Sequence, residues 1–142
     1  MKIKHCMIID RPVPEVFAYV TDFSRDPEWT TVVVESKMLS EPPLKVGSKN
    51  QAVLNFFGKK IQTTSEVIEY ELDRKVVSKS TSGTSNGVIT YLFAESGEGK
   101  TMFTVENESQ SGGAMKLLQP LVSWFLKNSV KRDLANLKTK LE

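Results

Sequence analysis

The most recognisable catalytic pattern in the chain is Gly83-Thr84-Ser85-Asn86-Gly87, which has the spacing G-x-S-x-G of a nucleophile elbow. In that motif a strained turn between a strand and a helix presents a serine for acyl transfer. Here strand-like patterns lie on both sides, Asn86-Gly87 is typical of a hairpin turn, and the only histidine precedes the serine. We therefore interpret the segment as a hairpin turn in which Ser85 is dispensable.

His5 and Cys6 are adjacent, and each is the only residue of its kind. An imidazole is a general base near neutral pH, but the sequence offers His5 no identifiable acidic partner, which favours a structural or solvated role. Alternation along a strand directs Cys6 to the opposite face, where we expect a small buried apolar side chain. One cysteine and one histidine cannot assemble a structural zinc site. We predict no metal, no cofactor and no catalytic residue.

Three further residues have both a functional and a structural interpretation. Glu106 and Glu108 share one face of a strand-like segment, and we favour a solvent-facing edge over a polar cavity floor. Trp29 follows a Pro-Glu turn, and a side chain of that size is costly to expose. For Trp29 we weigh core packing and ligand contact equally.

Length and composition describe an ordinary globular protein. The 142 residues are one domain's worth, with 39% hydrophobic and 25% charged residues, which excludes collagen-like, low-complexity and disordered classes. A formal charge of +2 is too balanced to favour nucleic acid or an anionic membrane as partner. The longest apolar stretch, 117–126, is interrupted by polar residues and a proline, so we expect no membrane span. A cytoplasmic location is expected.

The order of predicted elements is a strand, a helical pair, six strands and a long helix. The strand 2–9 ends at Asp10, and Val16, Phe17, Val20 and Phe23 form the apolar face of the next helix. A turn or short helix follows at 26–29. The six further strands are predicted at 31–40, 48–57, 60–72, 76–82, 88–95 and 101–109, and their short connections imply an antiparallel meander.

The segment after Gly113 is helical in pattern to its end. Its apolar stripe shifts around the axis partway along, so its two halves face different surroundings. We expect Leu134, Leu137 and Leu141 to anchor the second half on the sheet. The first half, next to Pro120, is expected to cover a cavity as a lid.

This plan is α+β, and the chain resembles the START-like or Bet v 1-like superfamily (SRPBCC proteins), in particular its polyketide cyclase/dehydrase-like branch. The resemblance spans 1–142 as one domain. It implies a helix-grip fold: a curved seven-stranded antiparallel sheet wrapped around a long C-terminal helix, with two short helices after the first strand. The segments that carry the resemblance are Ile9-Asp10-Arg11-Pro12, Glu15-Val16-Phe17, Val20-Thr21-Asp22, Pro27-Glu28-Trp29, Val46-Gly47-Ser48 and Leu134-Ala135-Asn136-Leu137-Lys138.

The resemblance implies a largely apolar cavity between the sheet and the long helix, which binds lipids, isoprenoids or polyketides in members of the superfamily. It supplies no universal catalytic motif, and it names neither the ligand nor the oligomeric state. Alternating apolar residues in the late strands and the apolar face of the last helix predict the lining. We expect the pocket to be lined by Phe17, Trp29, Tyr91, Phe93, Phe103, Leu118, Leu121 and Phe125.

Three functions are compatible with such a domain. The first is a non-enzymatic carrier or sensor that encloses a small hydrophobic molecule. The second is an aromatase/cyclase or dehydratase that uses the same cavity, and the third is a protein-interaction module. An inward-facing carboxylate or histidine would favour the enzyme, an apolar lining the carrier, and a large exposed apolar patch the interaction module.

Overall fold

The computed structural model describes residues 2–56, 58–81, 87–108 and 119–142, and residues 56, 119, 121–123 and 126 through their backbone alone. Strands and helices follow the predicted order. The strands are β1 (Lys2–Ile9), β2 (Val33–Met38), β3 (Lys49–Phe56), β4 (Lys59–Glu71), β5 (Lys75–Ser80), β6 (Val88–Glu95) and β7 (Thr101–Glu108). The helices are α1 (Val13–Thr21), the 3-10 turn η1 (Phe23–Arg25), α2 (Asp26–Trp29) and α3 (Gln119–Leu141).

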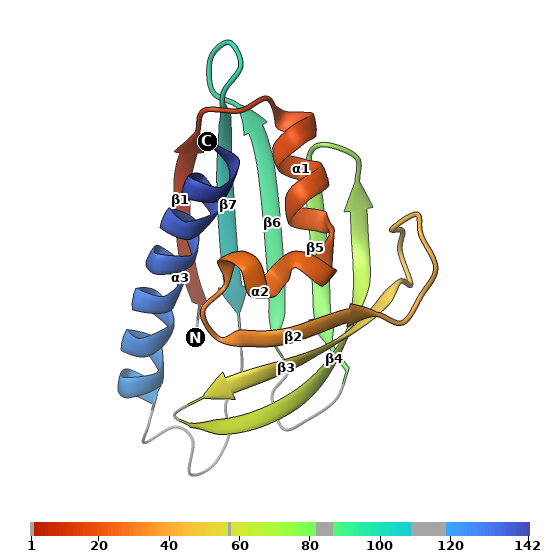
Figure 1. The fold of residues 1–142 in the computed structure, drawn as a ribbon, viewed down its shortest axis with the longest axis vertical. Helices are drawn as coiled ribbons and strands as arrows, with labels where there is room; N and C mark the ends of the chain where they lie inside the picture. The colour runs from red at the N-terminus through yellow and green to blue at the C-terminus, as the bar shows by residue number, and fades with distance from the viewer. Residues whose placement is uncertain (1, 57, 82–86, 109–118) are drawn as a thin grey trace.

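The seven strands form one antiparallel sheet in the order β1-β7-β6-β5-β4-β3-β2. Strands β2 to β7 are a meander, and β1 joins its far side by pairing with β7. Figure 1 shows β2, β3 and β4 swinging across the lower end of the other strands, with α1, α2 and α3 on one side of the sheet. The predicted helix-grip α+β fold, with a curved seven-stranded sheet, is confirmed.

The strand register divides the side chains between two faces. Tyr91 and Phe93 of β6 point toward the helices, and we call this side of the sheet the inner face. Cross-strand partners share a face, so His5, Val105, Tyr91 and Val76 form one inner row across four strands. The residues between them along each strand point to the outer face.

Helix α1 packs on the inner face through its predicted apolar side. The ring of Phe17 lies 5.0 Å from that of Phe93 and 5.8 Å from that of Tyr70, both edge-on. Val16, Phe17, Val20 and Phe23 are all buried, although Phe23 lies in η1 because the α-helix ends at Thr21.

Helix α3 is fixed at its C-terminal half, as predicted. Leu134 and Leu137 are buried in the same core as α1 and the sheet. At the end of the helix, Arg11 Nε donates to the Leu141 carbonyl at 2.7 Å, and Lys138 Nζ donates to the Ile8 carbonyl at 3.1 Å. The second half of α3 therefore anchors on β1. The predicted lid is the first half of the last helix, next to Gly112, Gly113 and Pro120; its residues up to 118 lie outside the described residues, so the lid stays a prediction.

The prediction of a buried Cys6 is wrong. Cys6 does point away from His5, but it lies on the outer face between Lys4 and Ile8, and its side chain is exposed. The described helices all lie on the other face. Alternation fixed the direction of Cys6 and left its burial to the tertiary structure.

Leu137→Ala should lower the free energy of unfolding by about 2–5 kcal/mol, because Leu137 is fully buried and alanine leaves a cavity. Trp124→Ala is the matched control on the same helix, since Trp124 is largely exposed, and its effect should stay within roughly 0.5 kcal/mol. Urea unfolding followed by far-ultraviolet circular dichroism measures both. Equal destabilisation by the two variants would contradict the anchoring role of the second half of α3.

Candidate functional site

Five residues of the predicted pocket lie together, in a buried aromatic cluster on the inner face. Trp29 is 3% exposed, and its ring is 6.4 Å from Tyr91 and 6.3 Å from Phe103. Tyr91 and Phe103 are 5.6 Å apart, and Phe93 and Phe103 are 5.1 Å apart. Phe17 joins the cluster through Phe93. The rings contact one another, so these residues close one end of the inner face and form a wall for any adjoining site.

The remaining predicted lining residues come from the last helix. Phe125 is half-buried, the side chain of Leu121 is not among those described, and Leu118 lies outside the described residues. The hairpin turn assigned to Ser85 also falls outside them. The cavity between α3 and the sheet therefore stays a prediction.

Beyond the aromatic cluster, two isoleucines of the inner face contact solvent. Ile89 on β6 and Ile61 on β4 point inward by register, yet they are 37% and 39% exposed. Ser78 and Ser65 lie between them on the same face. Both side chains are apolar, point to the inner face and still contact solvent. They therefore provide accessible apolar surface inside the curl of the sheet.

Four buried polar side-chain atoms of the described residues lack a protein partner, and one of them belongs to Ser78, the cross-strand partner of Ile89. Within the described part of the chain, the buried side-chain atoms without a hydrogen-bond partner are Asp26 Oδ1, Trp29 Nε1, Ser36 Oγ and Ser78 Oγ. Ser36 and Ser78 point to the inner face by register, and Asp26 and Trp29 share one face of α2 at spacing i, i+3. Leaving such a group unsatisfied costs about 1–3 kcal/mol, so this part of the molecule calls for a polar partner.

Asp26 is the acid that sequence reasoning did not select. Burial raises its pKa well above the ordinary value of 3.8, and the nearby Asp22 carboxylate raises it further. Burial also raises the pKa of the Tyr91 hydroxyl, with added contributions from Asp26 and Asp133. The Asp-Pro-Glu-Trp turn was the available signal, because an aspartate three residues before a buried tryptophan shares its helical face.

Helix α3 holds α2 against this site. Asp133 Oδ1 accepts a hydrogen bond from the Thr31 backbone N–H at 2.7 Å, and Asn136 Nδ2 donates to the Trp29 carbonyl at 3.3 Å. Burial raises the pKa of Asp133, partly offset by its bonds from Thr31. Trp29, at the end of α2, is thereby positioned by polar contacts from α3.

His5 is the second titratable side chain on the inner face. It is half-buried and belongs to the row of Tyr91, with Val105 between them. Burial lowers its pKa below 6.5, and the charges of Lys131 and Lys127 on α3 lower it further. The imidazole is therefore neutral at pH 7, so it is available as a base or a hydrogen-bonding group.

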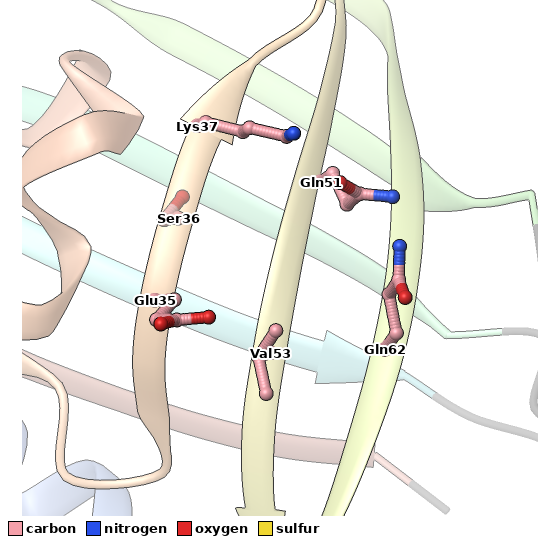
Figure 2. A pocket seen from close by; sticks show the side chains of 6 residues that line it. All are labelled: Glu35, Ser36, Lys37, Gln51, Val53 and Gln62. Carbon is pink, nitrogen blue, oxygen red and sulfur yellow. The ribbon is translucent and has the colours of Figure 1, made fainter.

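Two surface pockets adjoin the described residues, and one of them shares Phe17 with the aromatic cluster. One, of about 370 Å³, runs along β2, β3 and β4, where Figure 2 shows Glu35, Lys37, Gln51, Val53 and Gln62 along one side of three adjacent strands. These residues are cross-strand neighbours of the outer face, which makes this a polar depression outside the curl.

The other pocket, of about 530 Å³, lies between α1, the end of β4 and the segment that joins β2 to β3. Its walls include Phe17, Met38, Leu44 and Tyr70. Phe17 is the one predicted lining residue that it shares.

The described residues give no support for a metal centre, for an acidic cavity floor or for a membrane-spanning helix. Across the described ranges there is no group of three His, Cys, Asp or Glu side chains placed to hold a metal ion. Glu106 lies on the outer face and pairs with Lys4 at 3.6 Å, and Glu108 is exposed, as predicted. Of the described helices, none has the length and apolar character needed to cross a membrane.

Comparison with known proteins gives a match over nearly the whole chain. Residues 2–142 match the family described as polyketide cyclase / dehydrase and lipid transport. The comparison with curated proteins found no match.

Solved structures with the same fold cover this chain almost end to end. The protein TTHA0849 of Thermus thermophilus is 17% identical with a TM-score of 0.85, and the match covers 99% of this chain and 97% of that one. A START superfamily protein of Mycobacterium smegmatis is 11% identical with a TM-score of 0.81, covering 99% and 96%. The Zhui aromatase/cyclase of Streptomyces sp. R1128 is 10% identical with a TM-score of 0.82, covering 99% and 93%. At these identities the similarity establishes the fold.

Asp26→Asn should remove a pH-dependent loss of stability. Because the pKa of Asp26 is raised in the folded chain, the folded state holds the proton more tightly than the unfolded state. The free energy of unfolding therefore falls as pH rises from about 3.8 through the raised pKa. Asp133 contributes with the same sign, so the difference between variant and wild type isolates Asp26.

Urea unfolding at a series of pH values is the measurement. The stability of Asp26→Asn relative to wild type should increase with pH. Glu28→Gln is the control, because Glu28 is an exposed acid of the same helix, and its curve should run parallel to that of wild type. Parallel curves for Asp26→Asn as well would show that the Asp26 carboxyl titrates as it does in water.

Proposed function

We propose, on the premise that the chain belongs to the polyketide cyclase / dehydrase and lipid transport family, that it binds a small hydrophobic molecule on the inner face of the sheet. The ligand would lie over Ile61 and Ile89, against the wall formed by Trp29 and Tyr91. In this role the protein is a carrier or sensor, and the gain on binding is apolar surface removed from water.

One observation carries the proposal: two isoleucines that face the helices are left more than one-third exposed. Side chains on the same face at the other end, such as Phe93 and Phe103, are buried by their neighbours. An apolar ligand over Ile61 and Ile89 would cover the apolar side chains of this half of the inner face, as α1 covers those of the other half. The predicted lining from the first half of the last helix would then lie opposite the guest.

Titration with the neutral apolar fluorophore N-phenyl-1-naphthylamine tests this proposal. Ile89→Glu and Ile61→Glu should each weaken probe binding by about tenfold or more, because a carboxylate brings bound water into the apolar site. Ile8→Glu is the matched control: Ile8 is 38% exposed but points to the outer face, so probe affinity should be unchanged.

Circular dichroism on all three variants separates loss of binding from loss of fold. The inner-face site would be refuted if Ile8→Glu weakened the probe while Ile89→Glu and Ile61→Glu did not. That result would locate the apolar binding surface on the outer face and favour a protein-interaction role.

An enzyme of the cyclase or dehydratase type is the second candidate, and Asp26 is the observation that favours it. A carboxyl whose pKa is raised by burial is suited to act as a general acid, and His5, neutral at pH 7, can act as a base on the inner face. The row from His5 through Val105 to Tyr91 spans two strand spacings, about 10 Å. A ligand of the size of a folded polyketide chain could contact both groups.

Mass spectrometry of a linear poly-β-ketone thioester incubated with the protein separates the two candidates. An enzyme would release a product that has lost the mass of water, and Asp26→Asn would abolish this while Glu28→Gln would not. A carrier would bind the thioester and return it unchanged, although Ile89→Glu would still weaken its retention.

A further inference from the structure

The pocket of about 530 Å³ beside α1 is open to solvent and is separate from the surface over Ile61 and Ile89, neither of which lines it. Its volume falls within the roughly 300–1,000 Å³ that is usual for small-molecule sites. In Figure 1 the segment that joins β2 to β3, which forms one wall, lies at the right beside the end of β4. We call this the α1 pocket, and its apolar walls include Phe17, Met38, Leu44, Tyr70 and Leu72.

The apolar walls of the α1 pocket combine a fixed floor with an exposed rim. Phe17 belongs to the buried core, and Met38, Leu44 and Tyr70 are partly buried and pack against that core. The rings of Phe17 and Tyr70 lie 5.8 Å apart, edge-on. Leu72 also lines the pocket, yet it is 70% exposed. The pocket therefore offers an apolar ligand a contact surface that the core holds in place.

The charged side chains that line the α1 pocket are acidic. They are Asp22 and Glu41, and the described residues that line the pocket include no lysine or arginine. Asp22 pairs with Arg25, whose Nε lies 3.2 Å from Asp22 Oδ2. Glu41 is exposed and has no ion pair within the described part of the chain. The Glu41 carboxylate is therefore available to a cation from outside the protein.

The C-terminal end of α1 adds to this negative charge. Ala18 and Thr21 in its last turn and Asp22 at its C-cap all line the pocket. The carbonyl end of a helix carries a partial negative charge that favours a cation, and the last turn of α1 contains no basic residue. An ammonium group in the pocket would be attracted by the carboxylates and by the helix end together.

We propose that the α1 pocket is a second ligand site, for a small molecule that has an apolar body and a cationic amine. The apolar body lies on the floor of the pocket and against Leu72, and the ammonium group lies near Glu41 and the C-terminal end of α1. None of the residues that line the α1 pocket is a proposed contact of the inner-face ligand. The two proposals can therefore fail independently.

Three adamantane derivatives with the same apolar cage test the charge preference near neutral pH. They are 1-adamantanamine, which is a cation, 1-adamantanol, which is neutral, and 1-adamantanecarboxylate, which is an anion. Backbone amide shifts measured by NMR during each titration give the affinity and the location. The amine should bind about two- to fivefold more tightly than the alcohol, and the carboxylate should be weakest. Higher ionic strength should reduce this preference, because salt screens exposed charges.

Substitutions on the rim separate the charge from the apolar contact. Glu41→Gln should lower the affinity for the amine about two- to fivefold and leave that for the alcohol unchanged. Glu98→Gln is the matched control, because Glu98 is an exposed acid in the turn between β6 and β7 and does not line the pocket. Leu72→Gln should weaken the amine and the alcohol alike, since it removes apolar contact. Leu39→Gln should weaken neither, because Leu39 is exposed but lies outside the lining.

The amide spectra also verify that each variant is folded, and they distinguish the outcomes. The shifts should be largest around Ala18, Thr21 and Leu72. Equal binding of the three derivatives, or an unchanged amine affinity in Glu41→Gln, would show that the pocket does not recognise a cation. Shifts around Ile61 and Ile89 instead of α1 would refute the α1 pocket and support the inner-face site. If no derivative changes the spectrum, the α1 pocket is refuted, and N-phenyl-1-naphthylamine binding decides the proposed function separately.

Discussion

The pairing of β1 with β7 is the constraint on which the rest of the structure depends. It joins the first strand to the last through eight residue pairs, from Lys2 opposite Glu108 to Ile9 opposite Thr101. Thr101 is fully buried, and its hydroxyl donates to the Arg11 carbonyl at 2.7 Å, which fixes the exit of β1. With β1 in this register, Ile3, His5, Met7 and Ile9 face inward and provide the surface on which α3 rests. A shift of one residue would turn these side chains outward and leave Leu134 and Leu137 without a platform.

The inner face has two halves, which differ in how they are covered. Helix α1 packs Phe17 onto Phe93 and Tyr70 and closes one half as ordinary core. The other half keeps Ile61 and Ile89 accessible beside buried serine hydroxyls. The proposed ligand site lies over these two isoleucines. The fold by itself specifies no chemistry, so the function depends on the side chains of this face.

The buried polar atoms of Asp26 and the inward serines lower the stability of the fold, and they are suited to recognition of a ligand. A core of this size would be more stable with apolar groups in place of Asp26 and the inward serines, because each unsatisfied polar atom has a desolvation cost. Their position in the aromatic wall, together with the hydrogen bonds by which α3 holds α2, is what a binding site requires: rigid aromatic contact surface and a few fixed polar groups. The mixture of apolar and titratable groups is also why a carrier and an enzyme are both compatible with this face.

The sequence by itself determined the order of elements, the antiparallel meander, the family resemblance and the inward direction of Tyr91, Phe93 and Phe103, because strand alternation and short connections are local properties. It also identified the leucines that anchor α3. Only the tertiary structure decided that Cys6 is exposed, that the inward-facing Ile89 contacts solvent, and that one carboxyl oxygen of Asp26 is shielded from solvent. Periodicity tells which way a side chain points, whereas burial and pKa depend on which distant segment covers it, and that is set by the register and curvature of the whole sheet.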